Sequence, residues 1–575
     1  MLPPRLRRTY HLTLTTLGTV AAVLAASLCS AQSVYHNGFE PTAASTCVEK
    51  SIRRVGGDRL GFAFPTANGA VPGSSVDSTC IRLTGIESSV NFTANRGALV
   101  SVNGGPFQSP PVSLVENDEV RLRLTAPTIA DAEETSFVQI DGEFLADFTV
   151  RAANQARAPQ VFEVGPGKPF RELGEIANQL VAGDVVELSR DAVYQPVEFR
   201  RAGLPHAPIT LRAAEGGIAR PLIQGGSTTV SLRGAHHYRL QGIEITGGSQ
   251  ICLRHEANDT WLERSHVYGC ERHGILGADL YTGSLKITAT EVNDVGGQPP
   301  GENLKHPIYV ATDRDRYPGS VLRVERSHIH DFGGNGIKSR AERAEIHQNW
   351  IIASSRGIYS IELNGYEEYL TEPGLTADVF GNVLEHHHVF GLRMGGDGTG
   401  AHRGRVRIAH NTILQGSGFT QFTPVLRFFH ELEAVSVRNN VFARFADSAA
   451  NLPLRLVRDD ATWTQGARLL DGESNWVPNG SDSIAAGYLP AEWNGTTFGT
   501  TPGYADLDPQ GVSLSMLFPA EIVGIPVAPA ATGAFDIGNP LQQPEFGIPR
   551  ARPQPGNLIP QWAGPPQTPI LIGVH

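Results

Sequence analysis

One short motif returns along the middle of the chain, and its spacing limits the folds that the chain can adopt. The motif is Asn or Ser, then any residue, then an apolar residue. Its instances are Ser265-His266-Val267, Asn293-Asp294-Val295, Ser327-His328-Ile329, Asn349-Trp350-Ile351, Asn382-Val383-Leu384, Asn411-Thr412-Ile413 and Asn440-Val441-Phe442. Successive instances are 28, 34, 22, 33, 29 and 29 residues apart. Repeats of about 20–50 residues are typical of solenoids and propellers.

A glycine recurs at a fixed distance from the motif. Gly274, Gly336 and Gly391 each lie nine residues after the start of a motif and directly before an apolar residue. We expect each glycine to bend the chain with a positive φ, after which a strand starts. Stacking such units places every strand on its predecessor, and the asparagines at equivalent turns then bond to one another along the stack.

The irregular lengths between the repeats favour one solenoid in particular. The chain has 63 glycines and 39 prolines and only 18% charged residues, which predicts many turns and little helix. The insertions differ in length from repeat to repeat, which disfavours a propeller or a β-sandwich for this region. We therefore predict an all-β chain whose main body is a right-handed parallel β-helix solenoid.

The pattern divides the chain into four parts. Residues 1–31 are typical of a signal peptide, because arginines precede an apolar run and small residues precede Gln32. Residues 33–155 contain short alternating stretches, which predict a small Ig-like β-sandwich domain. We expect the β-helix over residues 160–445, with a helix over 171–181 covering its open end. Residues 446–575 are predicted to form final coils and an irregular tail that packs on the solenoid.

The signal peptide predicts a secreted or periplasmic protein, exported by the general or the twin-arginine route. No other apolar run approaches the roughly 20 residues that a membrane span needs. Four cysteines remain outside the signal, namely Cys47, Cys80, Cys252 and Cys270. An even number in an oxidising compartment suggests disulfides between the local pairs, Cys47 with Cys80 and Cys252 with Cys270. For the second pair, two small buried thiols are an equally good interpretation.

The alternation of side chains along each strand predicts one charged face of the solenoid. We expect Tyr309, Lys338, Ser360, Arg393 and Arg427 to form a column on this face. Arg340 and Glu362 are placed beside the column, and His306 at its edge. Long insertions over 296–305, 312–320, 365–375 and 395–404 flank the face and are typical of the walls of a binding cleft.

A basic column on an acidic chain indicates a groove for an anionic polymer. The net charge of −11 disfavours a nucleic-acid-binding protein, because such proteins usually carry positive charge over much of their surface. We expect an acidic polysaccharide as the partner, bound by His306, Tyr309, Arg340, Glu362 and Arg427. The alternative is an ordinary solvated strand face on which Glu362 pairs with Lys338 or Arg340.

Two segments resemble a known family. Gly336-Ile337-Lys338-Ser339-Arg340, followed by Ile346-His347-Gln348-Asn349-Trp350-Ile351, is similar to the lysine-bearing coil of the chondroitinase B and alginate lyase family. Phe390-Gly391-Leu392-Arg393-Met394-Gly395-Gly396 resembles that family's arginine-bearing coil. More broadly, the chain resembles secreted bacterial β-helix proteins of the pectate-lyase-like superfamily. The family resemblance implies that Lys338 is the Brønsted base, that Arg393 is the acid, and that calcium neutralises the uronate. Asp331 and Asn335 are the nearby candidates for calcium ligands.

The residues themselves support β-elimination and leave other activities open. A lysine has an ordinary pKa of about 10.4, and neighbouring arginines such as Arg340 and Arg393 would lower it toward that of a base. A glycoside hydrolase would need paired carboxylates, for which Glu362, Asp313, Asp315 and Asp397 are the candidates. The run His386-His387-His388 is a weak metal candidate. A non-catalytic carbohydrate-binding or adhesive β-helix is the remaining alternative.

Overall fold

The computed structural model describes residues 47–499 with gaps, and beyond them only the short strands β48 (Glu521–Val523) and β49 (Gln561–Ala563). The gaps are residues 53, 56–57, 60, 217–218, 279, 297–303, 354–356, 366–373, 388–389, 397–401, 417–423, 439, 445–453, 461–462, 464–469, 474 and 482–495. The predicted signal peptide therefore lies outside the described residues, as does most of the predicted tail. No helix of the described residues is long and apolar enough to cross a membrane.

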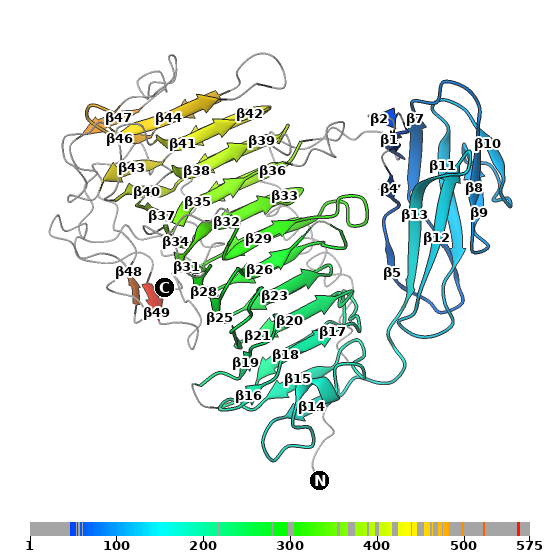
Figure 1. Cartoon of the computed structure of the whole chain (residues 1–575), viewed down its shortest axis with the longest axis horizontal. Helices are drawn as coiled ribbons and strands as arrows, with labels where there is room; N and C mark the ends of the chain where they lie inside the picture. The colour runs from blue at the N-terminus through cyan, green and yellow to red at the C-terminus, as the bar shows by residue number, and fades with distance from the viewer. Residues whose placement is uncertain are drawn as a thin grey trace, which may run out of the picture. The chain divides into compact units, whose positions relative to one another are not determined.

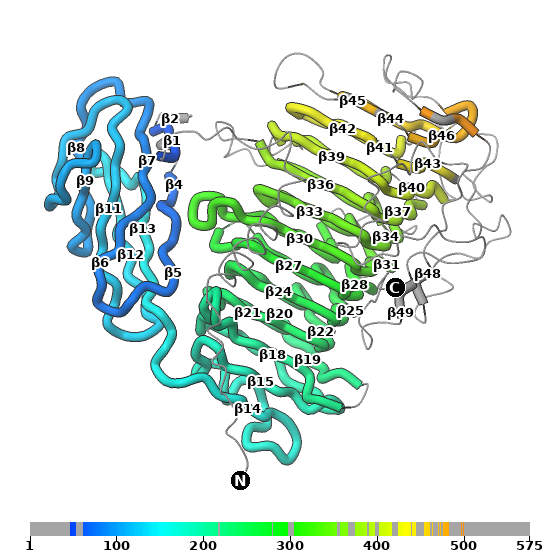
Figure 2. The backbone as a smooth tube through the Cα atoms, turned by 180° about the vertical axis from the view of Figure 1, so that it is seen from behind, coloured from blue at the N-terminus to red at the C-terminus, as the bar shows by residue number. Residues whose placement is uncertain are grey.

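Three long parallel sheets make up the main body, and from β15 to β44 the successive coils of the chain add one strand to each sheet (Figure 1). The first parallel sheet contains β14 (Val161–Val164), β15 (Val185–Leu188), β18 (Ile209–Ala213), β21 (Tyr238–Gln241), β24 (Thr260–Glu263), β27 (Leu285–Thr288), β30 (Val321–Glu325), β33 (Arg343–His347), β36 (Thr376–Phe380), β39 (Arg405–Ala409), β42 (Ala434–Arg438) and β45 (Leu470–Glu473). Figure 2 shows these strands stacked from β15 to β42. This arrangement confirms the predicted right-handed parallel β-helix.

The other two parallel sheets follow the same order. The second parallel sheet contains β16 (Val193–Tyr194), β19 (Leu222–Gln224), β22 (Glu244–Thr246), β25 (His266–Cys270), β28 (Glu291–Val295), β31 (His328–Phe332), β34 (Trp350–Ala353), β37 (Val383–His386), β40 (Thr412–Gln415), β43 (Val441–Arg444), β46 (Trp476–Pro478) and β47 (Thr497–Gly499). The third contains β17 (Val197–Phe199), β20 (Thr228–Arg233), β23 (Ile251–Glu256), β26 (His273–Gly277), β29 (Ile308–Ala311), β32 (Gly334–Arg340), β35 (Gly357–Leu363), β38 (Phe390–Gly395), β41 (Pro424–Phe429) and β44 (Arg455–Asp460). Coils therefore continue beyond residue 445, where the sequence motif fades.

Alternating side chains fill the interior of the coils. In β39, for example, Val406 and Ile408 are fully buried, whereas Arg405 and Arg407, which alternate with them, are only partly buried. One apolar cluster runs through the coils from Phe162 to Val477. The strands therefore form where the two-residue period puts aliphatic side chains inward.

The motif residues form a continuous ladder inside the coils, as predicted. The backbone N–H and the Nδ2 of Asn349 both donate to Oδ1 of Asn382, at 2.9 and 3.0 Å. Asn382 donates in the same way to Asn411, Asn411 to Asn440, and Asn440 to Asn475. Each amide thus satisfies buried backbone groups that would otherwise lack a partner at the turn.

One predicted member of the ladder is wrong. Asn293 lies within β28 and is paired with Tyr268 of β25. Thr290 takes the ladder position, because its N–H donates to Oγ of Ser327 at 3.2 Å and its Oγ1 accepts from the N–H of Ser265 at 3.5 Å. A threonine hydroxyl can accept the same bond as a serine, so Thr290-Glu291-Val292 fits a slightly wider motif.

The recurring glycines are required for a different reason than we expected. None of Gly274, Gly336 and Gly391 has a positive φ. A Cβ at Gly336 would lie 2.7 Å from the carbonyl oxygen of Ser360, and one at Gly274 would lie 2.5 Å from that of Pro307. The backbone of the next coil is therefore too close for any side chain at these positions.

The first coil is covered by a turn rather than by the predicted helix. Only Leu173–Glu175 is helical, as the single 3₁₀ turn η1. Leu173, Ile176 and Leu180 nevertheless belong to the buried apolar cluster. Gly174 in the middle of the segment disfavours an α-helix, but the apolar spacing still closes the open end of the solenoid.

Two smaller sheets precede the coils and enclose their own apolar cluster, as the predicted β-sandwich requires. One contains β1 (Cys47–Ser51), β6 (Ser75–Asp77), β7 (Cys80–Thr84), β9 (Leu99–Val102) and β11 (Glu119–Thr125). The other contains β4 (Phe62–Ala63), β5 (Ala67–Ala70), β8 (Val90–Ala94), β10 (Val112–Leu114), β12 (Glu133–Ile140) and β13 (Glu143–Ala152). The strands β2 (Arg54–Val55) and β3 (Asp58–Arg59) pair with each other. The Ig-like character and the limits 33–155 and 160–445 stay predictions.

Both suggested disulfides are present. Cys47 is bonded to Cys80, which joins the paired strands β1 and β7. Cys252 of β23 is bonded to Cys270 of β25. The second pair, for which buried thiols were an equal alternative, is therefore a disulfide.

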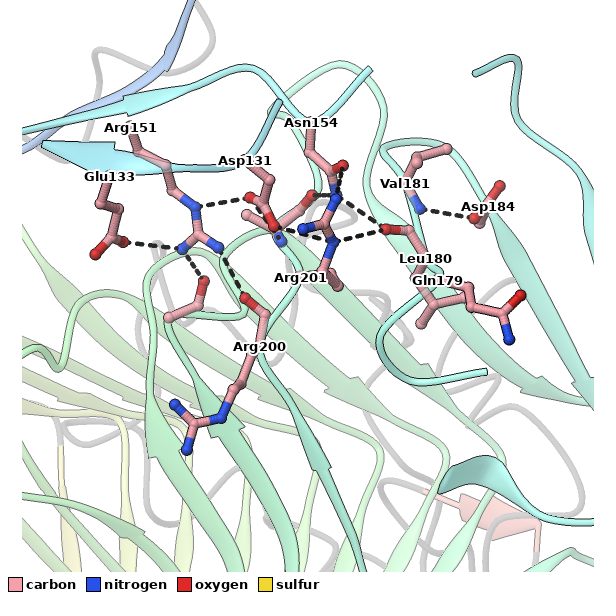
Figure 3. Close-up of polar contacts among 12 residues, drawn as sticks. Asp131, Glu133, Arg151, Asn154, Gln179, Leu180, Val181, Asp184, Arg200 and Arg201 are labelled. Atoms are coloured by element: carbon pink, nitrogen blue, oxygen red, sulfur yellow. Dashed lines mark hydrogen bonds and ion pairs between the residues drawn. The ribbon is translucent and has the colours of Figure 1, made fainter. Parts of the chain in front are cut away.

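A buried arginine links the sandwich to the first coils (Figure 3). The Arg151 guanidinium donates to Asp131 at 2.7 Å, to Glu133 at 3.2 Å and to the carbonyl oxygens of Gly234 and Arg200 at 2.5 and 2.7 Å. Two of these partners lie in the sandwich region and two in the coils. The planar fork of an arginine can make this set of bonds, whereas a lysine cannot.

We expect Arg151→Lys to lower the free energy of unfolding by about 1–3 kcal/mol, because buried acceptors lose their donors. Urea denaturation followed by tryptophan fluorescence measures this change. Arg123→Lys is the matched control, since Arg123 makes a two-pronged ion pair with Asp77 on the surface of the sandwich. Equal midpoints for the two variants would contradict the role given to Arg151.

Candidate active site

Five side chains stand in register on the outward face of the third parallel sheet. Tyr309 pairs with Lys338, Lys338 with Glu362, Glu362 with Arg393, and Arg393 with Arg427. We call these five residues the charged row. Because neighbouring strands lie about 4.8 Å apart, the row presents one functional group per coil at this spacing. Lys338 and Arg393 therefore share a face, as the sequence analysis required.

One predicted member of the row is replaced. Glu362, and not Ser360, lies opposite Lys338, and the Ser360 side chain is fully buried. Alternation along a strand cannot decide between these two residues, because they are two positions apart. The register between β32 and β35 decides it, and this register contains an irregularity between Gly334 and Asn335.

Glu362 is the centre of the row. Lys338 Nζ lies 3.3 Å from one carboxylate oxygen of Glu362, and Arg393 Nη1 donates to the other. Nδ2 of Asn335 also donates to the carboxylate. The Glu362 side chain is 2% exposed, whereas those of Lys338 and Arg393 are 13% and 11% exposed. A buried carboxylate thus fixes the spacing of two cations that still reach the surface.

Aromatic rings line the row, and of these only Tyr309 was predicted from the sequence. The Arg427 guanidinium lies 5.1 Å from the ring centre of Phe390 and 4.6 Å from that of Phe429. The Arg393 guanidinium lies 4.8 Å from Phe429, and Tyr359 stacks on Phe390 at 5.4 Å. Tyr359 is partly exposed and does not belong to the apolar cluster. The sequence contained a signal for these two rings, because Tyr359 and Phe390 each stand three positions before a residue of the row.

His306 and Arg340 lie beneath the face rather than on it. His306 is 1% exposed, and its Nδ1 accepts a hydrogen bond from the N–H of Asn335 at 3.1 Å. Burial, and after it the positive charge of Lys338, lowers the pKa of His306 well below its ordinary value. A neutral His306 therefore holds the backbone next to Asn335. The buried Arg340 guanidinium donates to the carbonyl oxygen of Gly365.

The row also extends further than we expected. Arg427 pairs with Arg458 of β44, which is partly buried. This residue lies in the part of the chain where the sequence motif is lost. Three arginines, Arg393, Arg427 and Arg458, therefore follow one another on successive coils.

The carboxylates suggested for glycoside hydrolysis are engaged elsewhere. Asp313 pairs with Arg316 at 2.9 Å, and Asp315 pairs with Lys50 of the sandwich at 2.7 Å. Asp397 lies outside the described residues, as does His388 of the histidine run. His387 bonds to Glu385 at 2.5 Å, and burial lowers the pKa of His386 to about 3. Within the charged row itself, Glu362 is the one acid, so the paired carboxylates of a hydrolase are not found there.

The residues around Lys338 do not fit calcium. This ion takes six to eight oxygen ligands, mainly carboxylates and carbonyls. The Glu362 oxygens already bond to Lys338, Arg393 and Asn335. Of the two suggested ligands, Asn335 donates its Nδ2 to Glu362, and Asp331 bonds to His330 of the second parallel sheet at 2.6 Å. No step of the chemistry below therefore uses calcium.

A hollow of about 750 Å³ lies beside the buried Arg151, lined among others by Asp131, Arg201, Arg233 and Tyr281. Concave sites of this size are common ligand pockets. Here, however, the lining arginines pair with lining acids: Arg201 contacts Asp131 at 3.2 Å, and Arg233 contacts Glu256 at 3.5 Å. We interpret this hollow as part of the contact between sandwich and coils, and the charged row as the better candidate site.

Comparison with known proteins adds no assignment beyond the fold. No protein-family model and no curated protein matches the chain. Solved structures that resemble it include pectate lyase Pel9A (TM-score 0.39, 12% identity, covering 62% of this chain and 85% of that one). A rhamnogalacturonan lyase has a TM-score of 0.39 and 13% identity, and the match covers 57% of this chain and 90% of that one. An alginate lyase from Paenibacillus sp. str. FPU-7 has a TM-score of 0.33 and 14% identity, and the match covers 54% of this chain and 97% of that one. At TM-scores this low, the similarities carry no argument about the activity of this chain.

Proposed function

We propose that the charged row binds an acidic, uronate-containing polysaccharide and cleaves it by β-elimination. The observation that carries this proposal is the register of Lys338, Glu362 and Arg393 on one face of the third parallel sheet. A chain with a net charge of −11 here concentrates cations on neighbouring coils. A polyanion is the partner that such a local cluster attracts.

The spacing and the aromatic rings suit a sugar polymer. Successive coils place one functional group about every 4.8 Å along the row, which is close to the length of one sugar unit, and Lys338 and Arg393 stand on either side of Glu362. The rings of Tyr309, Tyr359 and Phe429 lie between or beside these cations. Apolar ring faces with a few fixed polar groups are the usual composition of small-molecule sites.

β-Elimination needs three functions, and the row offers a group for each. Lys338 takes the proton from C5 of the uronate, after giving up its own proton. Arg393 donates hydrogen bonds to the leaving oxygen and stabilises its developing negative charge, and this oxygen then takes a proton from water. Arg427 pairs with the uronate carboxylate, for which a guanidinium is the best-matched partner. Glu362 positions Lys338 and Arg393, and the electron pair of the C5–H bond forms the new double bond as the C4–O4 bond breaks.

Incubation with alginate, pectate and glycosaminoglycans tests this proposal. We expect at least one of these polymers to give an unsaturated uronate product, measured by its ultraviolet absorbance. Reducing sugar ends without unsaturation would replace the proposal with hydrolysis. A panel that gives neither product would overturn it.

A non-catalytic binding role is the second candidate, and one observation favours it. Lys338 already forms an ion pair with Glu362 at 3.3 Å, so its ammonium has a partner before any polymer binds. A surface that only binds polyanions needs nothing more. Affinity for the same polymers, measured by affinity electrophoresis, without any product would decide for this role.

A further inference from the structure

A second cluster of ionisable side chains lies on the second parallel sheet, away from the charged row. It consists of Glu291 on β28 and of His328 and His330 on β31. One carboxylate oxygen and one nitrogen from each ring all lie within 4.8 Å of one another. His328 and His330 are two positions apart, so both side chains leave the strand on the same side.

The register between the two strands brings these groups together. Glu291 pairs with His328, and Asn293 pairs with His330. Glu291 Oε1 lies 3.1 Å from Nε2 of His330, and the rings of His328 and His330 stack at 4.1 Å. Glu291 and His330 are 39 residues apart in sequence, and the insertion between their strands does not disturb the pairing.

Two of the three members are buried and His330 is partly buried, which is unusual for the outer side of a sheet. Glu291 is 5% exposed and His328 is 1% exposed. A buried carboxylate is strongly unfavourable unless it is ion-paired or coordinates a metal. Among the described residues, the ion-pair partners of Glu291 are histidines, His330 at 3.1 Å and His266 at 3.9 Å. Histidines are also the commonest nitrogen ligands of metals.

An outer carboxylate orients the ring of His330. Nδ1 of His330 lies 2.6 Å from Oδ2 of Asp331, which is exposed. This contact leaves Nε2 directed at Glu291. A histidine that ligates a metal through one nitrogen commonly donates its other N–H to a carboxylate, which fixes the tautomer and the ring orientation.

We propose that Glu291, His328 and His330 bind a divalent transition-metal ion, with Zn²⁺ as the best fit. Two imidazoles and one carboxylate are a ligand set found in zinc sites, with the fourth position open. Ligand atoms at about 2.0–2.2 Å from a tetrahedral ion lie about 3.3–3.6 Å from each other. Oε1 of Glu291 and Nε2 of His330 lie 3.1 Å apart, slightly closer than that. Calcium and magnesium prefer oxygen ligands and do not suit two imidazoles.

The alternative is a purely structural ion pair. Burial alone would lower the pKa of His330, but the Asp331 and Glu291 carboxylates together raise it above its ordinary value. His330 would then be an imidazolium held between two carboxylates. Such a ring has no lone pair for a metal, so the two interpretations predict opposite outcomes when zinc is offered.

Zinc binding to the full-length protein tests the proposal. After removal of metals with a chelator, calorimetric titration with Zn²⁺ should show a single tight site, and Co²⁺ should give the visible absorption of a tetrahedral complex. We expect His330→Ala and Glu291→Gln to lose this site. Asp331→Asn should weaken it by about 10–100-fold, as removal of a group that orients a ligand usually does.

His387→Ala is the matched control, because His387 bonds to Glu385 at 2.5 Å at the end of β37 in the same sheet. It should bind zinc as the unmodified protein does. Asp331 is exposed, so Asp331→Asn keeps the test valid even if the buried variants do not fold. Absence of tight zinc binding to the unmodified protein, or full binding to folded His330→Ala, would overturn the proposal.

Discussion

Lys338→Ala should lower the rate of β-elimination by about 10²–10⁴-fold, the usual contribution of a general base. This effect rests on the proposed function and is measured as the initial rate of unsaturated product on the best polymer of the panel. The Michaelis constant should change much less, because Arg393 and Arg427 still bind the polymer. Substitution of Arg427 should show the opposite pattern, with a larger change in the Michaelis constant.

Lys286→Ala is a closely matched control for this substitution. Lys286 Nζ lies 2.9 Å from Glu325 of the next coil and 4.6 Å from the ring centre of Trp261 of the preceding coil. Lys338 contacts Glu362 and Tyr309 of its neighbouring coils in the same way, at 3.3 and 5.4 Å. Lys286, however, lies on the first parallel sheet. Equal losses of activity in the two variants would show that the effect comes from stability, and an active Lys338→Ala would refute the assigned base.

Asn411→Ala should destabilise the β-helix by about 2–6 kcal/mol, because it leaves two buried donors without an acceptor. Oδ1 of Asn411 accepts from the backbone N–H of Asn382 at 3.0 Å and from its Nδ2 at 2.9 Å. Nδ2 of Asn411 donates to the carbonyl oxygen of Val379 and to Oδ1 of Asn440. The alanine methyl group replaces none of these bonds. Urea denaturation followed by circular dichroism measures the loss.

Asn411→Ser should recover part of this stability. Ser327 occupies the same ladder position and accepts from the N–H of Thr290 at 3.2 Å through its hydroxyl. A serine at position 411 can accept one of the two bonds from Asn382. If the serine and alanine variants unfold at the same urea concentration, the ladder does not contribute as we expect.

The coil architecture could be predicted well because its signals are local. Asn349, Asn382, Asn411 and Asn440 each stand directly before a strand that the structure contains. Aliphatic residues at every second position then determine which side of that strand is buried. The motif failed at Thr290, where a different residue makes the same bond. Beyond residue 445 one instance was missed, because Asn475-Trp476-Val477 fits the motif and Asn475 accepts the ladder bond from Asn440.

The candidate site could be predicted only in part. Sequence alternation placed Lys338, Arg393 and Arg427 on one face, and the structure aligns them. It could not show that Glu362 stands between Lys338 and Arg393, or that His306 and Arg340 are buried. The cluster of Glu291, His328 and His330 was missed entirely, although His-x-His on a strand is a recognisable signal.

By itself, the sequence determined the period of the coils and the outward direction of Lys338 and Arg393, because both depend on neighbouring residues along one strand. Only the tertiary structure decided which side chains of different coils meet. Insertions of unequal length and the irregular register at Gly334 set those contacts. No local sequence pattern predicts how these shifts together align one coil with the next. The pairing of Lys338 with Glu362, and of Glu291 with His328, therefore became visible only in the folded chain.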